Sequence, residues 1–160
     1  MDVKAQFSRL LSIVSSANRF DWVVRGLAVG TDNVSAETLK SNGIDCVVSV
    51  GANLVEEYDV DKLFLNVEDG EPPSEEQSVK AVEWINRRIS EGKFVFVHCH
   101  AGMGRSVTLA ACYLIATGYT SDEALRLLRE RHPQSSPTKT QLTFLRSLET
   151  KYRGLLNQAK

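Results

Sequence analysis

Apolar residues in this chain gather in short runs, separated by segments with helical periodicity. The runs 44–50, 62–67 and 94–97 are rich in valine, leucine and phenylalanine, which is typical of buried strands. Two shorter segments, 20–24 and 26–30, are punctuated by glycine and predict short β segments at a sheet edge. Strands that alternate with helices predict an α/β fold, with a mainly parallel central sheet of four or five strands and helices on both faces.

Local end signals predict the helices between these strands. Residues 33–42 are expected to form a helix with Asp32 or Asn33 as its N-cap and Gly43 just beyond its end. A capping box over 74–77 opens a helix that runs to about Ser90. Further helical segments are expected at 53–58, at 107–117, at 120–132 and from about 138 onward.

The two ends of the chain carry different patterns. Apolar positions of residues 1–17 repeat at helical spacing: Val3, Phe7, Leu10, Leu11 and Val14. This pattern predicts an amphipathic helix packed on the domain, because the apolar core of a signal peptide would be continuous. Residues 154–160 are expected to form a frayed tail.

Composition narrows the class of protein further. A chain of 160 residues fits one domain with a sizeable core, and its net charge of −1 gives no reason to expect a nucleic acid or a membrane as partner. No apolar run approaches the roughly 18 residues of a membrane span. With no targeting signal, the cytoplasm is the expected location. Cys46 and Cys112 lie in apolar segments and are expected to be buried core thiols, so Cys99 is the cysteine of functional interest.

The segment 98–106, His-Cys-His-Ala-Gly-Met-Gly-Arg-Ser, lies between a predicted buried strand and a predicted buried helix. Its two glycines let the backbone turn so that several N–H groups point at one spot, and the helix N-terminus adds partial positive charge there. Such an environment favours a thiolate at Cys99 and binds an oxyanion. Arg105 can grip two oxygens of a phosphoryl group, and Ser106 can donate a hydrogen bond to the sulfur.

Phosphoryl transfer through a cysteine also requires an acid for the leaving oxygen and a base for the later attack of water. Asp69 is the first candidate, because its loop and the Cys99 loop both follow strands and should face one cleft. Glu68 and Glu71 are the rival candidates. Gln141 either positions the hydrolytic water or only caps its own helix.

A metal site is also considered, because His98 and His100 flank Cys99. It is disfavoured, since the chain has three histidines and offers no second ligand cluster.

These motifs resemble those of a known enzyme family. His98-Cys99-x-x-Gly102-x-x-Arg105-Ser106 is similar to the signature of the cysteine-dependent protein phosphatases. The short length and the Asp-x-x-Pro motif at 69–72 resemble the compact dual-specificity subgroup, including its atypical and archaeal-like members. The resemblance covers about residues 18–150, so residues 18–153 are expected to be a catalytic domain with the phosphatase fold.

The resemblance implies a role for each residue of the two loops. Cys99 attacks phosphorus and forms a phosphocysteine, while Asp69 protonates the leaving oxygen and then activates water. Ser106 assists the departure of the thiolate, and His98 supports the loop. The phosphoryl oxygens are held by Arg105 and by the backbone of the residues before it: His100, Ala101, Gly102, Met103 and Gly104. No metal and no organic cofactor is needed.

The expected substrate is a phosphoprotein or phosphopeptide carrying phosphotyrosine, with phosphoserine, phosphothreonine and the oligomeric state left open. The resemblance disfavours a phosphoinositide, because family members that act on such lipids tend to carry lysines at the variable positions, and positions 100, 101, 103 and 104 carry none here. An RNA 5′-phosphate is disfavoured by the lack of a basic patch. An arsenate reductase or a sulfurtransferase also uses a cysteine-headed anion loop, but the flanking His98 and Ser106 and the upstream acid argue against both. A non-catalytic phosphopeptide-binding module is disfavoured because the cysteine, the arginine and the acid are all present.

Overall fold

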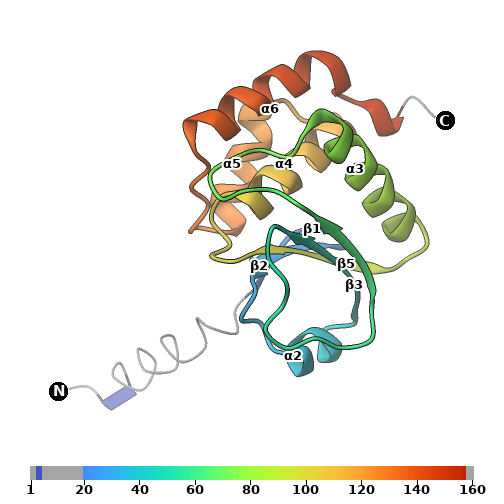
Figure 1. The fold of residues 1–160 in the computed structure, drawn as a ribbon, viewed down its shortest axis with the longest axis vertical. Helices are drawn as coiled ribbons and strands as arrows, with labels where there is room; N and C mark the ends of the chain where they lie inside the picture. The colour runs from blue at the N-terminus through green and yellow to red at the C-terminus, as the bar shows by residue number, and fades with distance from the viewer. Residues whose placement is uncertain (1–2, 5–19, 158–160) are drawn as a thin grey trace.

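The computed structural model describes residues 3–4 and 20–157. They form one five-stranded sheet in the order β1-β2-β5-β3-β4 (Figure 1). Only the pairing of β1 with β2 is antiparallel, and the other neighbours run parallel. The strands are β1 (Phe20–Val24), β2 (Leu27–Thr31), β3 (Ile44–Val50), β4 (Asp61–Leu65) and β5 (Phe94–Cys99). The predicted α/β class and the mainly parallel sheet are confirmed.

Helices cover both faces of this sheet, as the sequence predicts. One face carries α3 (Glu75–Ser90), α4 (Arg105–Thr117), α5 (Ser121–Arg131) and α6 (Lys139–Tyr152), whereas α2 (Ala36–Ser41) lies on the other (Figure 1). Side chains alternate along β5 accordingly, because successive residues of a strand point to opposite faces. Val95 and Val97 join the core on the four-helix side, and Phe96 joins the core beneath α2.

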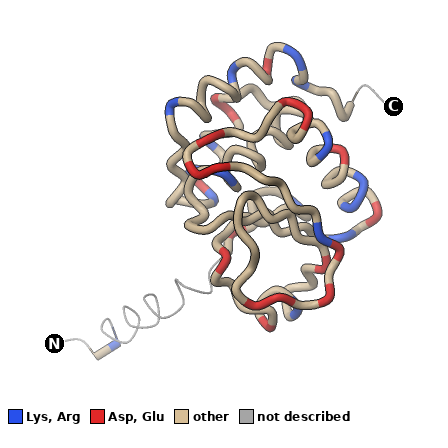
Figure 2. Tube along the Cα trace, viewed as in Figure 1, with Lys and Arg blue, Asp and Glu red and all other residues tan. Residues whose placement is uncertain are grey.

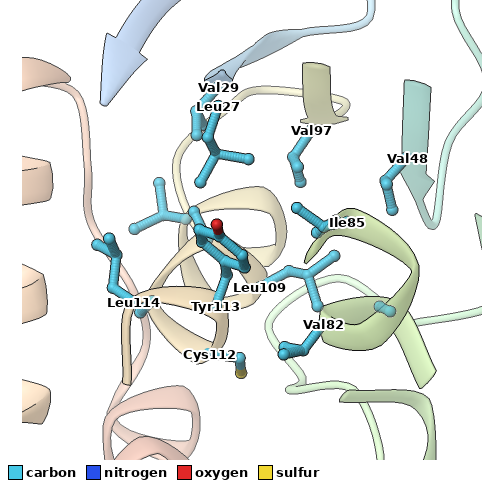
Figure 3. Close-up of a cluster of buried hydrophobic side chains, with 14 of the residues drawn as sticks. Leu27, Val29, Val48, Val82, Ile85, Val97, Leu109, Cys112, Tyr113 and Leu114 are labelled. Carbon is cyan, nitrogen blue, oxygen red and sulfur yellow. The ribbon is translucent and has the colours of Figure 1, made fainter. Parts of the chain in front are cut away.

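Helix α4 is the centre of the larger core, because its residues 105–116 are all buried. Figure 3 shows Leu109 and Tyr113 of α4 between Val29 and Val97 of the sheet and Ile85 of α3. Contact on all sides fixes the axis of α4 relative to β5. The segment that joins them, which contains the predicted phosphate-binding loop, therefore begins and ends on packed elements.

Several predicted helix ends are confirmed, and one is wrong. Capping boxes open α3 at Ser74, α5 at Thr120 and α6 at Thr138. Helix α2, in contrast, begins after Ser35, whose Oγ accepts from Thr38 N–H at 3.1 Å. Asp32 is not its N-cap, because the Asp32 carboxylate contacts His100 instead.

Other predicted segments also differ from the structure. Residues 53–58 form bends and not a helical turn, and β4 spans Asp61–Leu65 and not 62–67. Of the two segments predicted at a sheet edge, only β1 lies there, since β2 pairs with β5 on its other side. A short 3-10 helix, Leu155–Asn157, packs its leucines on the core where a frayed tail was expected. The predicted helix over residues 1–17 lies outside the described residues, apart from residues 3–4.

Acidic and basic residues are interspersed along the described helices and loops (Figure 2). Within the described part of the chain, no helix combines the length and the apolar character that crossing a bilayer requires.

Candidate active site

The site lies at the carboxyl ends of the parallel strands, where α/β sheets commonly bind ligands. Strand β5 ends at Cys99, and the chain after β4 brings Asp69 to the same edge. Together with Thr138 and Gln141 from the start of α6, these segments enclose a pocket of about 250 Å³. The structure thus brings together the two loops that the sequence analysis places across one cleft.

Hydrogen bonds hold the backbone carbonyls of the 99–105 loop on its outer side. The Met103 carbonyl accepts from Ser136 N–H, and the Gly104 carbonyl accepts from Thr108 N–H, both at 2.8 Å. All described peptide bonds are trans, so each N–H points opposite to the carbonyl of its own peptide group. Among the described residues, no hydrogen bond is donated by the N–H groups of residues 100–105. These amides are therefore free to bind an anion.

Cys99 lies at the base of this loop with 2 % of its surface exposed. Its Sγ is 3.2 Å from Oγ of Ser106, which is buried in the first turn of α4. A sulfur at a helix N-terminus with a hydroxyl donor beside it is an environment that stabilises a thiolate.

Arg105 is held by two backbone carbonyls from the segments that follow β3 and β4. Its Nη1 donates to the carbonyl of Gly51 at 3.2 Å and to that of Val67 at 3.1 Å. The side chain is nearly buried, and its Nε has no hydrogen-bond partner among the described residues. An oxyanion in the pocket can accept from this Nε, because the guanidinium is fixed on its far side by the two carbonyls.

Gly51 is a residue of this site that the sequence analysis does not identify. Its φ of +76° is in the region that favours glycine, and a Cβ there would overlap Nη1 of Arg105 and the carbonyl oxygen of Val67. The sequence does show a glycine directly after a buried strand. It does not show that this glycine contacts Arg105, because the two residues lie 54 positions apart along the chain.

Asp69 lies at the rim of the pocket with 96 % of its side chain exposed. Its Oδ1 is 3.8 Å from Nε of Arg105, so the carboxylate reaches the side of the guanidinium that faces the pocket. Neither Glu68 nor Glu71 is among the residues that line this pocket. Of the three carboxylates considered from the sequence, Asp69 is the one the structure brings to Cys99.

The start of α6 holds the Asp69 loop. Gln141 is buried, and its Oε1 accepts from Thr138 N–H at 2.9 Å, which is the capping interaction predicted from the sequence. Its Nε2 also donates to the carbonyl of Glu71 at 3.1 Å, and Thr138 Oγ1 donates to that of Gly70 at 2.7 Å. Two successive carbonyls of the loop are therefore fixed by α6, a contact that sequence reasoning missed.

His98 is fully buried and supports the loop from below. Its Nδ1 is 3.2 Å from the carbonyl of Cys99, and its Nε2 is 2.7 Å from Oγ of Ser49. Burial lowers the pKa of His98 to about 4, so the ring is neutral near pH 7. Because a carbonyl only accepts, Nδ1 carries the proton and donates to Cys99, while Nε2 accepts from the Ser49 hydroxyl.

His100 is directed differently from His98. Its side chain is largely exposed, and its Nδ1 lies 2.8 Å from a carboxylate oxygen of Asp32. Among the described residues, no group of three or more histidine, cysteine or acidic side chains has the geometry of a metal site. Cys46 and Cys112 are buried core thiols, as predicted.

Fold and site together place free backbone amides and the Arg105 guanidinium beside the Cys99 sulfur, an arrangement that can bind an oxyanion. The family model for the dual specificity phosphatase catalytic domain matches residues 28–151. The chain therefore belongs to the dual specificity phosphatase family.

Relatives of known name extend this comparison. Dual specificity protein phosphatase 1B of Arabidopsis thaliana is 28 % identical over 138 residues, which cover 82 % of this chain and 83 % of the relative. Protein tyrosine phosphatase domain-containing protein 1 of Mus musculus is 49 % identical over 59 residues, 36 % of this chain. The match covers only 8 % of that mouse protein.

Solved structures show the same fold. The structure of DUSP15 superposes with a TM-score of 0.80 at 22 % identity, covering 88 % of this chain and 94 % of that one. The structure of Tk-PTP in the active form superposes with a TM-score of 0.72 at 28 % identity, covering 82 % of this chain and 97 % of that one.

Proposed function

We propose that this domain hydrolyses phosphate monoesters on proteins through a phosphocysteine intermediate. One observation carries the proposal: Cys99 Sγ lies at the N-terminus of α4, inside a loop whose amides have no partner in the described chain. Arg105, fixed by two carbonyls, supplies the positive charge at the same point. Such preorganised donors stabilise charge that develops on phosphoryl oxygens in the transition state.

The first step forms the sulfur–phosphorus bond and breaks the bond between phosphorus and the leaving oxygen. Asp69 gives its proton to that oxygen, for which its place at the pocket rim is suited. In the second step water attacks phosphorus and loses a proton to the Asp69 carboxylate. The sulfur–phosphorus bond breaks, and the hydroxyl of Ser106 stabilises the departing thiolate.

Three features support a phosphoprotein as substrate. The pocket is small, and its acid lies exposed at the rim, so a phosphorylated side chain on a peptide can enter from solvent. Among the described residues, no lysine lines the pocket to bind further phosphates of an inositol headgroup. The three described cysteines are unpaired and buried, which fits a reducing compartment such as the cytoplasm.

A lipid phosphate is the second candidate. The phosphatidylglycerophosphate phosphatase PTPMT1 of Arabidopsis thaliana is 38 % identical over 87 residues, which are 26 % of that protein. A structure of PTPMT1 in complex with PI(5)P also shares the fold, with a TM-score of 0.75.

Phosphate release from phosphotyrosine, phosphoserine and phosphothreonine peptides, from phosphatidylinositol 5-phosphate and from phosphatidylglycerophosphate tests both candidates. The phosphotyrosine peptide is expected to give the highest kcat/KM, and Cys99→Ser is the control that must abolish turnover. Faster hydrolysis of either lipid would show that the substrate is a lipid phosphate and not a phosphoprotein. Activity that survives in Cys99→Ser would refute the phosphocysteine mechanism.

A further inference from the structure

His132 is a fully buried histidine that the proposed chemistry does not use. It follows the last residue of α5, and its ring lies between the edge strand β1 and the phosphate-binding loop. Its Nδ1 is 2.7 Å from a carboxylate oxygen of Asp21, and its Nε2 is 2.5 Å from the carbonyl oxygen of Gly102. The ring thus connects a charged group on β1 to the backbone of the active site.

The two partners of His132 fix the number of protons on its ring. A carboxylate oxygen and a carbonyl oxygen both accept hydrogen bonds, so each ring nitrogen must donate. A neutral imidazole has one N–H and would turn its other nitrogen's lone pair toward an acceptor. With Asp21 ionised, the two acceptors place a proton on each ring nitrogen, so the geometry fits an imidazolium that is paired with the Asp21 carboxylate.

Other groups around the ring are compatible with a positive charge. The backbone N–H of His132 donates to the carbonyl of Leu128 at 2.7 Å, so the ring lies at the C-terminal end of α5, where a helix stabilises cations. The charged neighbours in α5, Glu130 and Arg131, are exposed, and the phosphate-binding loop offers the ring a carbonyl. Asp21 is the charged side chain in direct contact with the ring.

The bond to Gly102 controls the direction of an amide in the pocket. Because the peptide is trans and planar, a carbonyl held toward His132 turns the N–H of Met103 to the opposite side. Gly102 has a φ of +68°, and a Cβ there would lie 2.9 Å from the carbonyl oxygen of Gly30. The position thus requires glycine, whose backbone is the least restricted of all, and an external contact must select one orientation.

We propose that Asp21 and His132 form a buried charged brace that holds the phosphate-binding loop in its anion-binding conformation. Both are positioning residues, since they act on the phosphoryl group through the backbone of Gly102 and Met103. The inference rests on the proposed function only in taking the bound anion to be a phosphoryl group.

The proton count is tested directly by NMR on the wild-type protein with ¹⁵N-labelled histidine. His132 is expected to show two protonated ring nitrogens at pH 7, whereas His98 is the internal reference for a neutral buried ring. A single proton on His132 would overturn the proposal. This measurement needs no enzymatic activity, so it stands whatever the substrate is.

Binding of inorganic phosphate, measured by calorimetry, tests the effect on the loop. His132→Gln keeps an N–H donor but no charge, and is expected to bind phosphate about tenfold more weakly, as for a lost charged hydrogen bond. Glu130→Gln, on the exposed side of the same turn, is the control and should bind as the wild type does. A folded His132→Gln variant that binds phosphate as tightly as the wild type would also overturn the proposal that His132 braces the loop.

Asp21→Asn provides the test if His132→Gln does not fold. Without the carboxylate, the contact between the side chain at position 21 and the His132 ring no longer joins two opposite charges, so phosphate should bind more weakly than to the wild type. Unchanged affinity would refute the pairing. A wild-type protein that shows the imidazolium and binds phosphate, yet hydrolyses no phosphate ester, would refute only the proposed function.

Discussion

Replacing Gly51 by alanine tests the two backbone contacts that hold Arg105. The new Cβ would overlap Nη1 of Arg105 and the carbonyl oxygen of Val67, so the guanidinium must move away from its two carbonyl partners. A hydrogen bond from a charged donor is worth about 1.5–3 kcal/mol, and roughly 1.4 kcal/mol corresponds to tenfold in rate. If the misplaced arginine loses one such bond to the transition state, kcat/KM falls by about 10- to 100-fold.

Backbone strain must be separated from this effect, and Gly92 provides the matched control. Its φ of +81° is close to the +76° of Gly51, but a Cβ at Gly92 has no neighbour within 4 Å. Each alanine should cost about 1–2 kcal/mol for its left-handed backbone, and each kcal/mol lowers Tm by about 2–4 °C in a domain of this size. Only Gly51→Ala should lose activity.

Hydrolysis of p-nitrophenyl phosphate and thermal unfolding, measured on both variants, give the two quantities. The expected result is a larger loss of Tm in Gly51→Ala, because its Cβ also overlaps a backbone oxygen, together with kcat/KM reduced in Gly51→Ala and within about twofold of wild type in Gly92→Ala. Equal activity in the two variants would show that the carbonyls of Gly51 and Val67 do not position Arg105.

Three further predictions concern the acid and the supporting contacts. Asp69→Asn should lower kcat far more than it changes KM, because the acid acts only in the transition state. Glu71→Gln should leave kcat unchanged. Steady-state kinetics with the reverse pattern would assign the acid to Glu71. Thr138→Val should lower kcat several-fold by releasing the carbonyl of Gly70, and Thr138→Ser should restore it. A Thr138→Ser variant as slow as the valine variant would contradict the role of this hydroxyl. Burial lowers the pKa of His98 from 6.5 to about 4, so on acidification His98 is protonated in the unfolded chain at a higher pH than in the folded protein. The free energy of unfolding is therefore full above pH 6.5 and falls by up to about 3 kcal/mol as the pH drops to 4. Urea unfolding across this pH range should show a flatter dependence in His98→Asn, and an equal slope in both proteins would refute it.

The sequence predicts best where the signal is local and continuous. Strand β3 matches its predicted bounds of 44–50, because a buried parallel strand is an unbroken apolar run closed here by a glycine. Helix α3 also has both predicted ends, since Ser74 and Gln77 specify its start through side chains that contact only neighbouring backbone.

Local signals fail where several residues compete for one role. Asp32, Asn33 and Ser35 can all cap a helix, and the start of α2 depends on which is free. Asp32 is bound to His100, 68 residues away, so the choice is made by tertiary structure. The same holds for the site, where the partners of Arg105 lie 54 and 38 residues away along the chain.

The remaining contacts at the site depend on sheet order. Strand β5 lies between β2 and β3, and this placement brings Asp32 from one side and Gly51 from the other to the Cys99 loop. Pattern and spacing identify the strands and their ends, but they do not state which strands are neighbours. The sequence therefore predicted that Cys99, Arg105 and Asp69 share one cleft, as the structure shows, whereas the groups that hold them were not predictable.

The burial of Cys46 and Cys112 in the core should make thiol-modifying reagents selective among the three cysteines. Burial raises the pKa of both Cys46 and Cys112 to about 12, so almost none of either is ionised at neutral pH. Cys99 is also nearly buried, with 2 % of its surface exposed, but unlike the other two thiols it lines the pocket that has the exposed Asp69 at its rim. An alkylating reagent or peroxide should therefore modify Cys99 and leave Cys46 and Cys112 unmodified. A single mass increment on the folded protein would then report the fraction of Cys99 that has been modified.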